Sequence, residues 1–251
     1  VDDIHHRWNE IKTSIDRGLA QLADRKDFNE RLKFERGCNE ISNVLRRWLN
    51  QVETLISTIK QRASGPSPCQ EQEMVIQRRE NANIAERLEE IYPQIETVIS
   101  DATNFIRTTN ETGNQAFINN KALLDIASSK DQLGNKTKIL RDNWELYQRK
   151  INILDKILGN MKACNEIVTN YERELVGISQ VPQQIDILKK LIEVIERLQS
   201  EVPVHDPEFV RLDQIFGEVV REIEGINRNM GLNASDQSLN IYKNEISLIK
   251  D

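Results

Sequence analysis

The residues of this sequence best suited to chemistry are its histidines and paired carboxylates. His6 and Glu10 are four residues apart, so on a helix they would place two potential metal ligands on one face. No third or fourth ligand is near in the sequence, and His205 lies in a proline-flanked turn without an identifiable partner. Adjacent carboxylates such as Glu89 and Glu90 are common on solvated helices, and they need a desolvating pocket before either can act as an acid or base. We therefore expect all of these to be surface residues.

The cysteines give no stronger indication of a site. Cys38, Cys69 and Cys164 are odd in number and widely spaced, a pattern that favours free thiols in a reducing cytoplasm over a disulfide framework. The sequence also lacks a Cys-x-x-Cys pair, a phosphate-binding glycine-rich loop and a Gly-x-Ser-x-Gly motif. We therefore predict no catalytic, cofactor-binding or metal-binding residues, no cofactor and no enzymatic activity.

The composition favours long helices and argues against several classes of partner. Only 10 Gly and 6 Pro occur in 251 residues, so few positions can break a helix. The net charge is −6 and no long run carries one sign, which argues against binding to nucleic acid or directly to an anionic membrane. No apolar run approaches the ~20 residues needed to span a bilayer. Three Asn-x-Ser/Thr sequons could mark a secreted chain, although chance is the favoured explanation in an Asn-rich helical sequence.

Apolar residues then recur at steps of three and four, the pattern of helices packed side by side at a shallow angle. The first series is Ile4, Trp8, Ile11, Ile15, Gly18 and Leu22. The second series is Phe34, Cys38, Ile41, Leu45, Trp48, Val52, Leu55 and Ile59. The phase slips between the two series, and two explanations stay open. Either a capping box at residues 27–30 starts a new helix, or residues 1–63 form one helix with a stutter.

The sequence Ser64-Gly65-Pro66-Ser67-Pro68 predicts the first clear stop, and this connector could also be a docking or modification site. Ser67, Pro68 and Gln70 fit the N-cap, N1 and N3 positions of a new helix over about 69–110. Pro93 falls inside this helix, where the loss of a backbone hydrogen bond should produce a kink.

Residues 115–178 are the most informative stretch, because one heptad frame runs through them without a proline. Its apolar positions are Leu123, Ile126, Leu133, Leu140, Trp144, Tyr147, Ile151, Leu154, Leu158, Met161, Val168 and Leu175. At ~1.5 Å per residue this helix would be on the order of 95 Å long, which is more than one small bundle can bury. We therefore predict that it serves two packing units in succession.

Three shorter helices follow. The first starts at Val181-Pro182 and stops at Val202-Pro203, and the second starts at Asp206-Pro207 and ends at Gly231. Ser235 could cap a last helix that carries Leu239, Tyr242, Ile246 and Ile249.

These segments predict an all-α chain of tandem three-helix bundles joined by a long continuous helix, an elongated rod. Residues 1–27 form the end of a preceding helix or an N-terminal extension. Residues 28–154 form the first repeat, residues 155–231 a second, shorter repeat, and residues 232–251 a C-terminal helix.

The arrangement resembles the spectrin-repeat family. Leu45-Arg46-Arg47-Trp48-Leu49, followed by Glu53 and Leu55, is similar to the first-helix signature of that family. Trp144, with Leu140 before it, is similar to the third-helix tryptophan, and Trp8 to the same position in a preceding repeat.

Two departures from the family pattern narrow the resemblance. The interval from Trp48 to Trp144 is longer than in a regular repeat. A weak internal echo, Gly37-Cys38-Asn39-Glu40-Ile41 against Ala163-Cys164-Asn165-Glu166-Ile167, places Glu174 where a second first-helix tryptophan would stand. These irregularities suit nesprin-like nuclear-envelope linkers, plakins and other giant cytoskeletal linkers better than spectrin itself.

The resemblance implies a non-catalytic linker that couples the nuclear envelope to actin or microtubule motors. Its partners would be cytoskeletal or motor proteins, with self-association left open. Its place would be the cytoplasm, on the cytoskeleton or the cytoplasmic face of the outer nuclear membrane. The alternatives are a spectrin- or plakin-type cortical linker and a helical membrane-tethering or trafficking domain.

One short motif allows a second interpretation. Asp142-Asn143-Trp144-Glu145 resembles the tryptophan-plus-acid peptides that kinesin light chains bind, which would require an exposed Trp144. The heptad frame instead predicts that Trp144 lies in a core with Trp48, and Trp8 is expected to be a core residue by the same argument.

Overall fold

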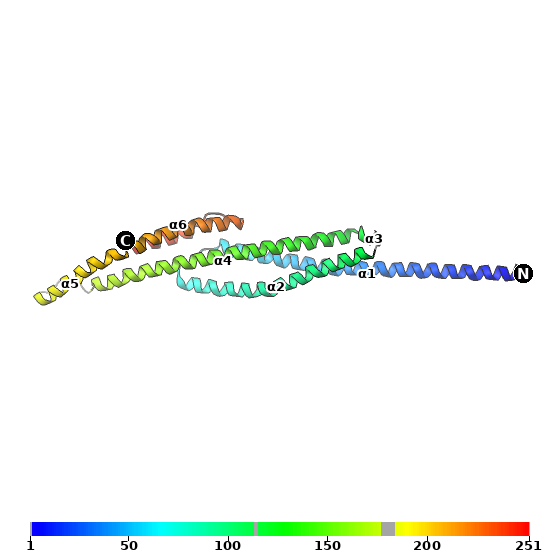
Figure 1. Ribbon diagram of the computed structural model, residues 1–251, viewed down its shortest axis with the longest axis horizontal. Helices are drawn as coiled ribbons and strands as arrows, with labels where there is room; N and C mark the ends of the chain where they lie inside the picture. Colours follow the sequence, from blue (N-terminus) through cyan, green and yellow to red (C-terminus); the bar gives the residue numbers. More distant parts are fainter. Residues whose placement is uncertain (1, 113–114, 177–183, 251) are drawn as a thin grey trace. The chain divides into compact units, whose positions relative to one another are not determined.

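The computed structural model describes residues 2–112, 115–176 and 184–250, and these are almost entirely helical (Figure 1). The helices are α1 (Asp2–Ser64), α2 (Glu71–Glu111), α3 (Gln115–Ile118), α4 (Lys121–Val176), α5 (Ile185–Glu201), α6 (Asp206–Asn229) and α7 (Leu239–Lys250), with a 3-10 helix, η1 (Val202–His205), between α5 and α6. No strand occurs in these ranges. The predicted all-α class is therefore confirmed.

Residues 2–64 form one helix, which decides between the two explanations for the phase slip. α1 runs through residues 27–30 without interruption, so the capping box does not start a new helix. The two apolar series are one helix with a stutter. At ~100° per residue, the series containing Leu22 and the series containing Phe34 point about 120° apart around the helix axis.

The long helix predicted over 115–178 is observed as α4, 56 residues from Lys121 to Val176, with α3 as a separate turn before it. Gly134 and Gly159 lie inside α4 without breaking it. The predicted helix start at Val181-Pro182 lies outside the described residues.

The contacts divide the chain into two compact units. Unit 1 contains Val1–Thr54 and Glu90–Lys138, and unit 2 contains Leu55–Glu89 and Ile139–Asp251. The boundaries fall inside α1, α2 and α4, so each of these three helices contributes residues to both units. The repeat limits expected from the sequence, at residues 27, 154 and 231, remain a prediction.

Unit 1 is a bundle of α1, α2 and α4 closed at one end by stacked aromatic rings. The ring of Phe34 stacks on Phe117 with centroids 4.6 Å apart and on Phe105 at 6.3 Å. The buried apolar residues of the unit are Phe34, Cys38, Leu45, Trp48, Val52, Ile91, Ile95, Ala102, Leu123, Ile126 and Leu133. The prediction that Trp48 is a core residue is confirmed, since its side chain is only 6% exposed.

The first apolar series does not lie in a core. Trp8 is 65% exposed, and Ile11, Ile15 and Leu22 are exposed as well, so the prediction of a buried Trp8 was wrong. The side chain of Ile4 lies outside the described part of the chain. The first series is exposed because the neighbouring helices are too short to cover it. α2 ends at Glu111 and α4 begins at Lys121, near the aromatic cluster of Phe34. Residues 5–28 of α1 therefore continue past the bundle (Figure 1).

In unit 2, α4 buries part of the row that the sequence indicated and a second row that it did not. Leu140, Tyr147, Leu154 and Met161 are buried as expected. The adjacent inward row is Asn143, Lys150, Ile157 and Cys164, three residues after each of them. Ile151 is also buried, but Trp144 is only half-buried and Leu158 is not in the core. The predicted core position of Trp144 was therefore wrong, and Trp48 and Trp144 belong to different units.

The helices after α4 also differ from the predicted three-helix bundle. The expected stop at Val202-Pro203 is a single 3-10 turn, η1, and α6 follows α5 along the same direction (Figure 1). Pro203 and Pro207 sit at the first turns of η1 and α6, where a missing N–H is tolerated. Gly231, at φ +70°, ends α6 as predicted, with Leu232 N–H donating to the Asn227 carbonyl at 2.8 Å.

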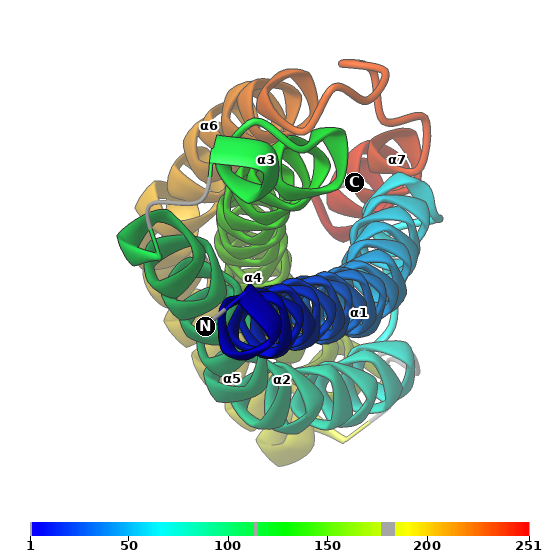
Figure 2. The ribbon, with the colours of Figure 1, turned by 90° about the vertical axis from the view of Figure 1, so that its right-hand side faces the viewer.

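The last helix packs back on the connector between α1 and α2. Leu239, Tyr242 and Ile246 of α7 are buried, as the sequence predicted. The Tyr242 hydroxyl donates to the Pro68 carbonyl, and Figure 2 shows α7 beside the last turns of α1. Unit 2 thus combines the end of α1, the start of α2, most of α4, and α5 to α7.

Candidate functional site

The residues that the sequence singled out for metal or acid–base chemistry lie apart and exposed. His6 Nε2 is 3.4 Å from Glu10 Oε1, and both side chains are mostly exposed. His205 Nδ1 lies 3.4 Å from Glu208 Oε2 on the surface of unit 2. Glu89 and Glu90 are exposed, so no pocket desolvates either carboxylate. Across the described ranges, no group of three His, Cys, Asp or Glu residues is arranged to hold a metal ion.

The cysteines are free thiols held in their unreactive form. Cys38 and Cys164 are buried and Cys69 is partly buried. Burial raises the pKa of each thiol, and nearby carboxylates such as Glu35 at Cys38 and Glu208 at Cys164 raise it further. Because the thiolate is the nucleophile, these environments disfavour catalysis by any of the three.

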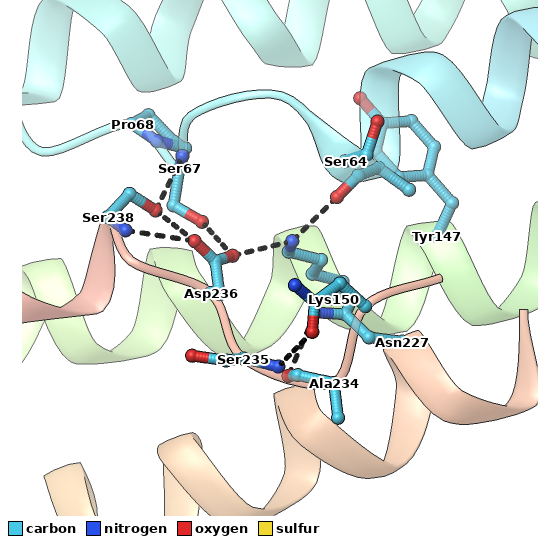
Figure 3. A network of polar contacts seen from close by, with 12 residues as sticks. Ser64, Ser67, Pro68, Tyr147, Lys150, Asn227, Ala234, Ser235, Asp236 and Ser238 are labelled. Carbon is cyan, nitrogen blue, oxygen red and sulfur yellow. Dashed lines mark hydrogen bonds and ion pairs between the residues drawn. The ribbon is translucent and has the colours of Figure 1, made fainter. Parts of the chain in front are cut away.

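Unit 2 contains a polar junction built around a buried ion pair, Lys150 with Asp236 (Figure 3). Lys150 of α4 donates from Nζ to Asp236 Oδ2 at 2.8 Å and to the Ala63 carbonyl at 2.7 Å. The side chains of Lys150 and Asp236 are 3% and 9% exposed. The junction therefore joins three segments, namely the end of α1, the middle of α4 and the turn before α7.

Asp236 is the hub of this junction. Its carboxylate accepts from the Ser67 hydroxyl at 3.0 Å, from the Ser238 backbone N–H at 3.1 Å and from the Ser238 hydroxyl. Ser67 N–H in turn donates to Ser238 Oγ at 2.9 Å. Burial alone would raise the pKa of the Asp236 carboxyl, but hydrogen bonds from Lys150 and Ser238 and the charge of Lys150 outweigh it and hold the pKa below its usual value. The buried charge is thus paired and fully hydrogen-bonded, the arrangement that a stable buried ion pair requires.

Ser67 does not have the role that the sequence predicted for it. Its hydroxyl points to Asp236 and does not cap α2. The start of α2 is capped instead by Glu73, whose carboxylate accepts from the Cys69 N–H at 2.8 Å and the Gln70 N–H at 3.3 Å. Ser67 therefore binds the connector to the C-terminal segment, and does not cap a helix.

Beside this junction is a half-open hollow of about 470 Å³ between α2, α4 and α7. Its apolar wall includes Met74, Leu158 and Ile249, and Gly159 lies in its floor, where no atom would come within 4 Å of an added Cβ. Two ion pairs cross its rim, Arg78 with Asp155 and Lys162 with Glu71. Cys69 also lines the hollow, but burial and nearby carboxylates such as Glu73 and Glu245 raise the pKa of its thiol, which disfavours the nucleophilic thiolate. We therefore interpret the hollow as a gap in packing.

The region around Trp144 is a shallow, open surface of α4. Asp142 and Glu145 are exposed and Trp144 is half-buried, its ring tilted against Tyr147 at 6.1 Å. Gln148 and Arg149 lie beside it on the same surface. Binding to a kinesin light chain would require an exposed Trp144. The half-buried ring meets this requirement only in part.

The exposed part of α1 is a second surface of interest. Its large apolar side chains are exposed by about half or more of their area, and they are Trp8, Ile11, Ile15, Leu19, Leu22 and Phe28. Scattered exposed apolar residues are ordinary on a protein surface, but a contiguous stripe along a helix indicates an interaction face.

Comparisons with known proteins leave the family unassigned. No protein-family model matches the sequence, and no curated protein matches it significantly. Within the described ranges, no helix combines the length and the apolarity needed to cross a bilayer.

Proposed function

We propose that this chain is a non-catalytic structural linker, a segment of a cytoskeletal cross-linking protein built from spectrin-like repeats. The observation that carries the proposal is the sharing of helices: α1, α2 and α4 pass without a break from the residues of unit 1 to those of unit 2. A hinge between the units would require bending or melting three helices at once. Such a connection suits a spacer that transmits load between its ends.

Helical continuity also matches the energetics expected of a spacer. A long helix such as α4 gains most of its stability from the packing of its apolar face. Its buried row runs from Leu123 in unit 1 to Cys164 in unit 2. Each unit therefore stabilises the part of α4 that it covers, and no loop is needed between the two parts.

The proposed setting is the cytoplasm, where the chain would couple the nuclear envelope to actin filaments or microtubule motors. A spectrin- or plakin-type cortical linker is the alternative within the same class. These settings rest on the resemblance of the Leu45–Leu49 and Trp144 regions to spectrin repeats. The partners in either setting would be cytoskeletal or motor proteins.

Small-angle X-ray scattering on two variants of one residue tests the mechanical part. Lys138 is exposed and is the last α4 residue of unit 1. Lys138→Pro should break α4 there, at about 3 kcal/mol or more, whereas Lys138→Ala leaves the helix intact. Because α1 and α2 still pass from one unit to the other, we expect both variants to keep the distance distribution of the parent and to stay folded by circular dichroism. A broader distribution in the proline variant alone would show that α4 by itself holds the connection, and would contradict the sharing of load by three helices.

Liposome co-sedimentation tests the membrane-tethering alternative. A linker of the proposed kind should remain in the supernatant with vesicles of phosphatidylcholine and phosphatidylserine. Salt-resistant pelleting of the intact chain would favour the tethering function instead.

A further inference from the structure

The exposed stripe of α1, residues 7–28, has a charge pattern that selects its partner. In heptad notation Trp8, Ile15 and Leu22 occupy a positions, and Ile11, Gly18 and Arg25 occupy d positions. The flanking e and g positions carry Arg7, Lys12, Ser14, Leu19, Gln21, Lys26 and Phe28. These flanks include three cations and no carboxylate.

The carboxylates of the same segment all lie on the other side of the helix. Glu10, Asp16, Asp24 and Asp27 occupy b, c and f positions, which point away from the stripe. Arg17, also at a c position, is the one cation among them. The segment thus has basic flanks beside the apolar stripe and its carboxylates behind it.

We propose that this face binds an amphipathic helix of another polypeptide whose apolar stripe is flanked by Asp and Glu. Charge complementarity carries the choice, because e and g residues set partner and orientation in helix pairs. Gly18 supports it sterically: no atom lies within 4 Å of a Cβ placed there, so a large partner side chain can fill the gap between Ile15 and Leu22. The inference stands independently of the linker function.

A second copy of this chain fits the face less well. In a parallel pair, Arg7 of each copy would lie opposite Lys12 of the other copy. In an antiparallel pair, e positions face e positions and g positions face g positions, so Lys12 and Lys26 again meet cations. Either arrangement of identical chains places like charges together, which is destabilising.

The segment does not fold into its own neighbouring bundle either. The exposed stripe and the buried row that begins at Phe34 point about 120° apart on α1. A helix seated on Trp8 and Leu22 would therefore approach from a different side than α2 and α4 do in unit 1. The stripe is a distinct face of the helix.

An anionic membrane is the other class of surface that a basic, tryptophan-containing face could suit. Interfacial helices carry a wide apolar face and a basic polar face. Here the apolar stripe is narrow, and residues 7–28 carry five Lys and Arg against four Asp and Glu, a net charge of +1. That charge is too small for strong attraction to anionic lipids, so a helical protein partner is favoured.

Two synthetic helical peptides of about 28 residues, which is four heptads, provide the test. Both carry Ile at a and Leu at d. One has Glu at every e and g position and the other has Lys. Fluorescence anisotropy of the labelled peptides with the full chain should show the Glu peptide binding at least about tenfold tighter than the Lys peptide. The variant Arg7→Glu/Lys12→Glu/Lys26→Glu should reverse that order.

Matched controls separate the stripe from general electrostatics. Ile15→Asp/Leu22→Asp should abolish binding of the Glu peptide, whereas Ala20→Asp/Ala23→Asp, on the outer face with the same added charge, should retain it. Failure of both peptides to bind, or equal binding of both, would overturn the proposal. So would a chain dimer in analytical ultracentrifugation, or pelleting with phosphatidylserine vesicles, if either were lost in Ile15→Asp/Leu22→Asp and retained in Ala20→Asp/Ala23→Asp.

Discussion

Lys150 Nζ lies 2.8 Å from Asp236 Oδ2, and the two side chains are 3% and 9% exposed. Lys150 occupies an inward position of α4, and Asp236 lies in the turn between α6 and α7. Because Asp236 also accepts from Ser67, this one pair couples the C-terminal segment to the connector between α1 and α2. Besides this pair, α7 is held by the buried side chains of Leu239, Tyr242 and Ile246 and by the ion pair of Lys250 with Asp213.

The effects of removing Lys150 and Asp236 on the free energy of unfolding should not be additive. Lys150→Met leaves the Asp236 carboxylate buried without its cation, which should lower the free energy of unfolding by about 3–5 kcal/mol. Lys150→Met/Asp236→Leu should lose clearly less than the sum of the two single variants. Urea denaturation of the four proteins gives the coupling energy. Additive losses would show that the two side chains do not depend on each other.

Acid should weaken unit 2 through Asp236. Its pKa is lowered in the folded protein because the hydrogen bonds and the charge of Lys150 outweigh burial. A carboxyl with a depressed folded pKa adds stability that is fully present above its unfolded pKa and is lost as pH falls through the folded pKa. Stability should therefore decline below about pH 4, and Asp236→Asn should flatten this decline. Parallel profiles of urea midpoint against pH for parent and variant would contradict the assignment.

The three tryptophans should differ sharply in their effect on stability. Trp48→Ala removes a buried ring from unit 1 and should cost about 3–5 kcal/mol. Trp8→Ala removes a ring that is 65% exposed and should change stability by less than about 0.5 kcal/mol. Trp144→Ala should fall between them. Chemical denaturation measures all three, and a Trp8 variant as unstable as the Trp48 variant would show that the N-terminal stripe is covered within the chain.

Glycines of α1 and α4 should respond to alanine with opposite signs. A Cβ at Gly37 would lie 2.6 Å from Cε2 of Phe105, so Gly37→Ala must displace a ring of the aromatic cluster and should destabilise unit 1 by about 1–3 kcal/mol. Nothing lies within 4 Å of a Cβ at Gly134, so Gly134→Ala should gain up to about 1 kcal/mol from helix propensity. Thermal melts distinguish the two, and stabilisation by Gly37→Ala would mean that the cluster is looser than described.

The helices could be predicted from the sequence because periodicity and breakers act locally. The scarcity of Gly and Pro indicated the all-α class, the connector at Ser64–Pro68 indicated the α1 stop, and Gly231 indicated the end of α6. Local sequence could not predict which structure forms at Val202-Pro203. A proline in the first turn is compatible with both a chain reversal and a short 3-10 link, and tertiary packing selects the link.

The sequence did not predict the buried junction, because Asn143 and Lys150 are polar and polar residues are not expected in a core. An apolar pattern on α4 favours Trp144 and Leu158 over Asn143 and Lys150. The inward row includes Lys150 because Asp236 and the Ala63 carbonyl, both distant in sequence, satisfy its ammonium group. The available signal was the spacing of Asn143, Lys150, Ile157 and Cys164 at seven residues, which runs beside the apolar row of Leu140 and Tyr147.

The exposed stripe was missed for the opposite reason. Trp8, Ile15 and Leu22 have the heptad spacing of a core, and spacing alone does not reveal whether a partner helix is present. The charge sorting around them was visible in the sequence.

The most direct test of the linker account is the distance between two spin labels on α4. Gln132 in unit 1 and Glu172 in unit 2 are both exposed, and labels at Gln132→Cys and Glu172→Cys can be placed in a Cys38→Ala/Cys69→Ser/Cys164→Ala background. Circular dichroism first verifies that this background stays folded. Double electron–electron resonance should then give one narrow distribution centred about 60 Å, from ~1.5 Å per residue over about 40 residues. A broad distribution, or a main peak near half that distance, would show that α4 bends or folds back between the units and would contradict the account.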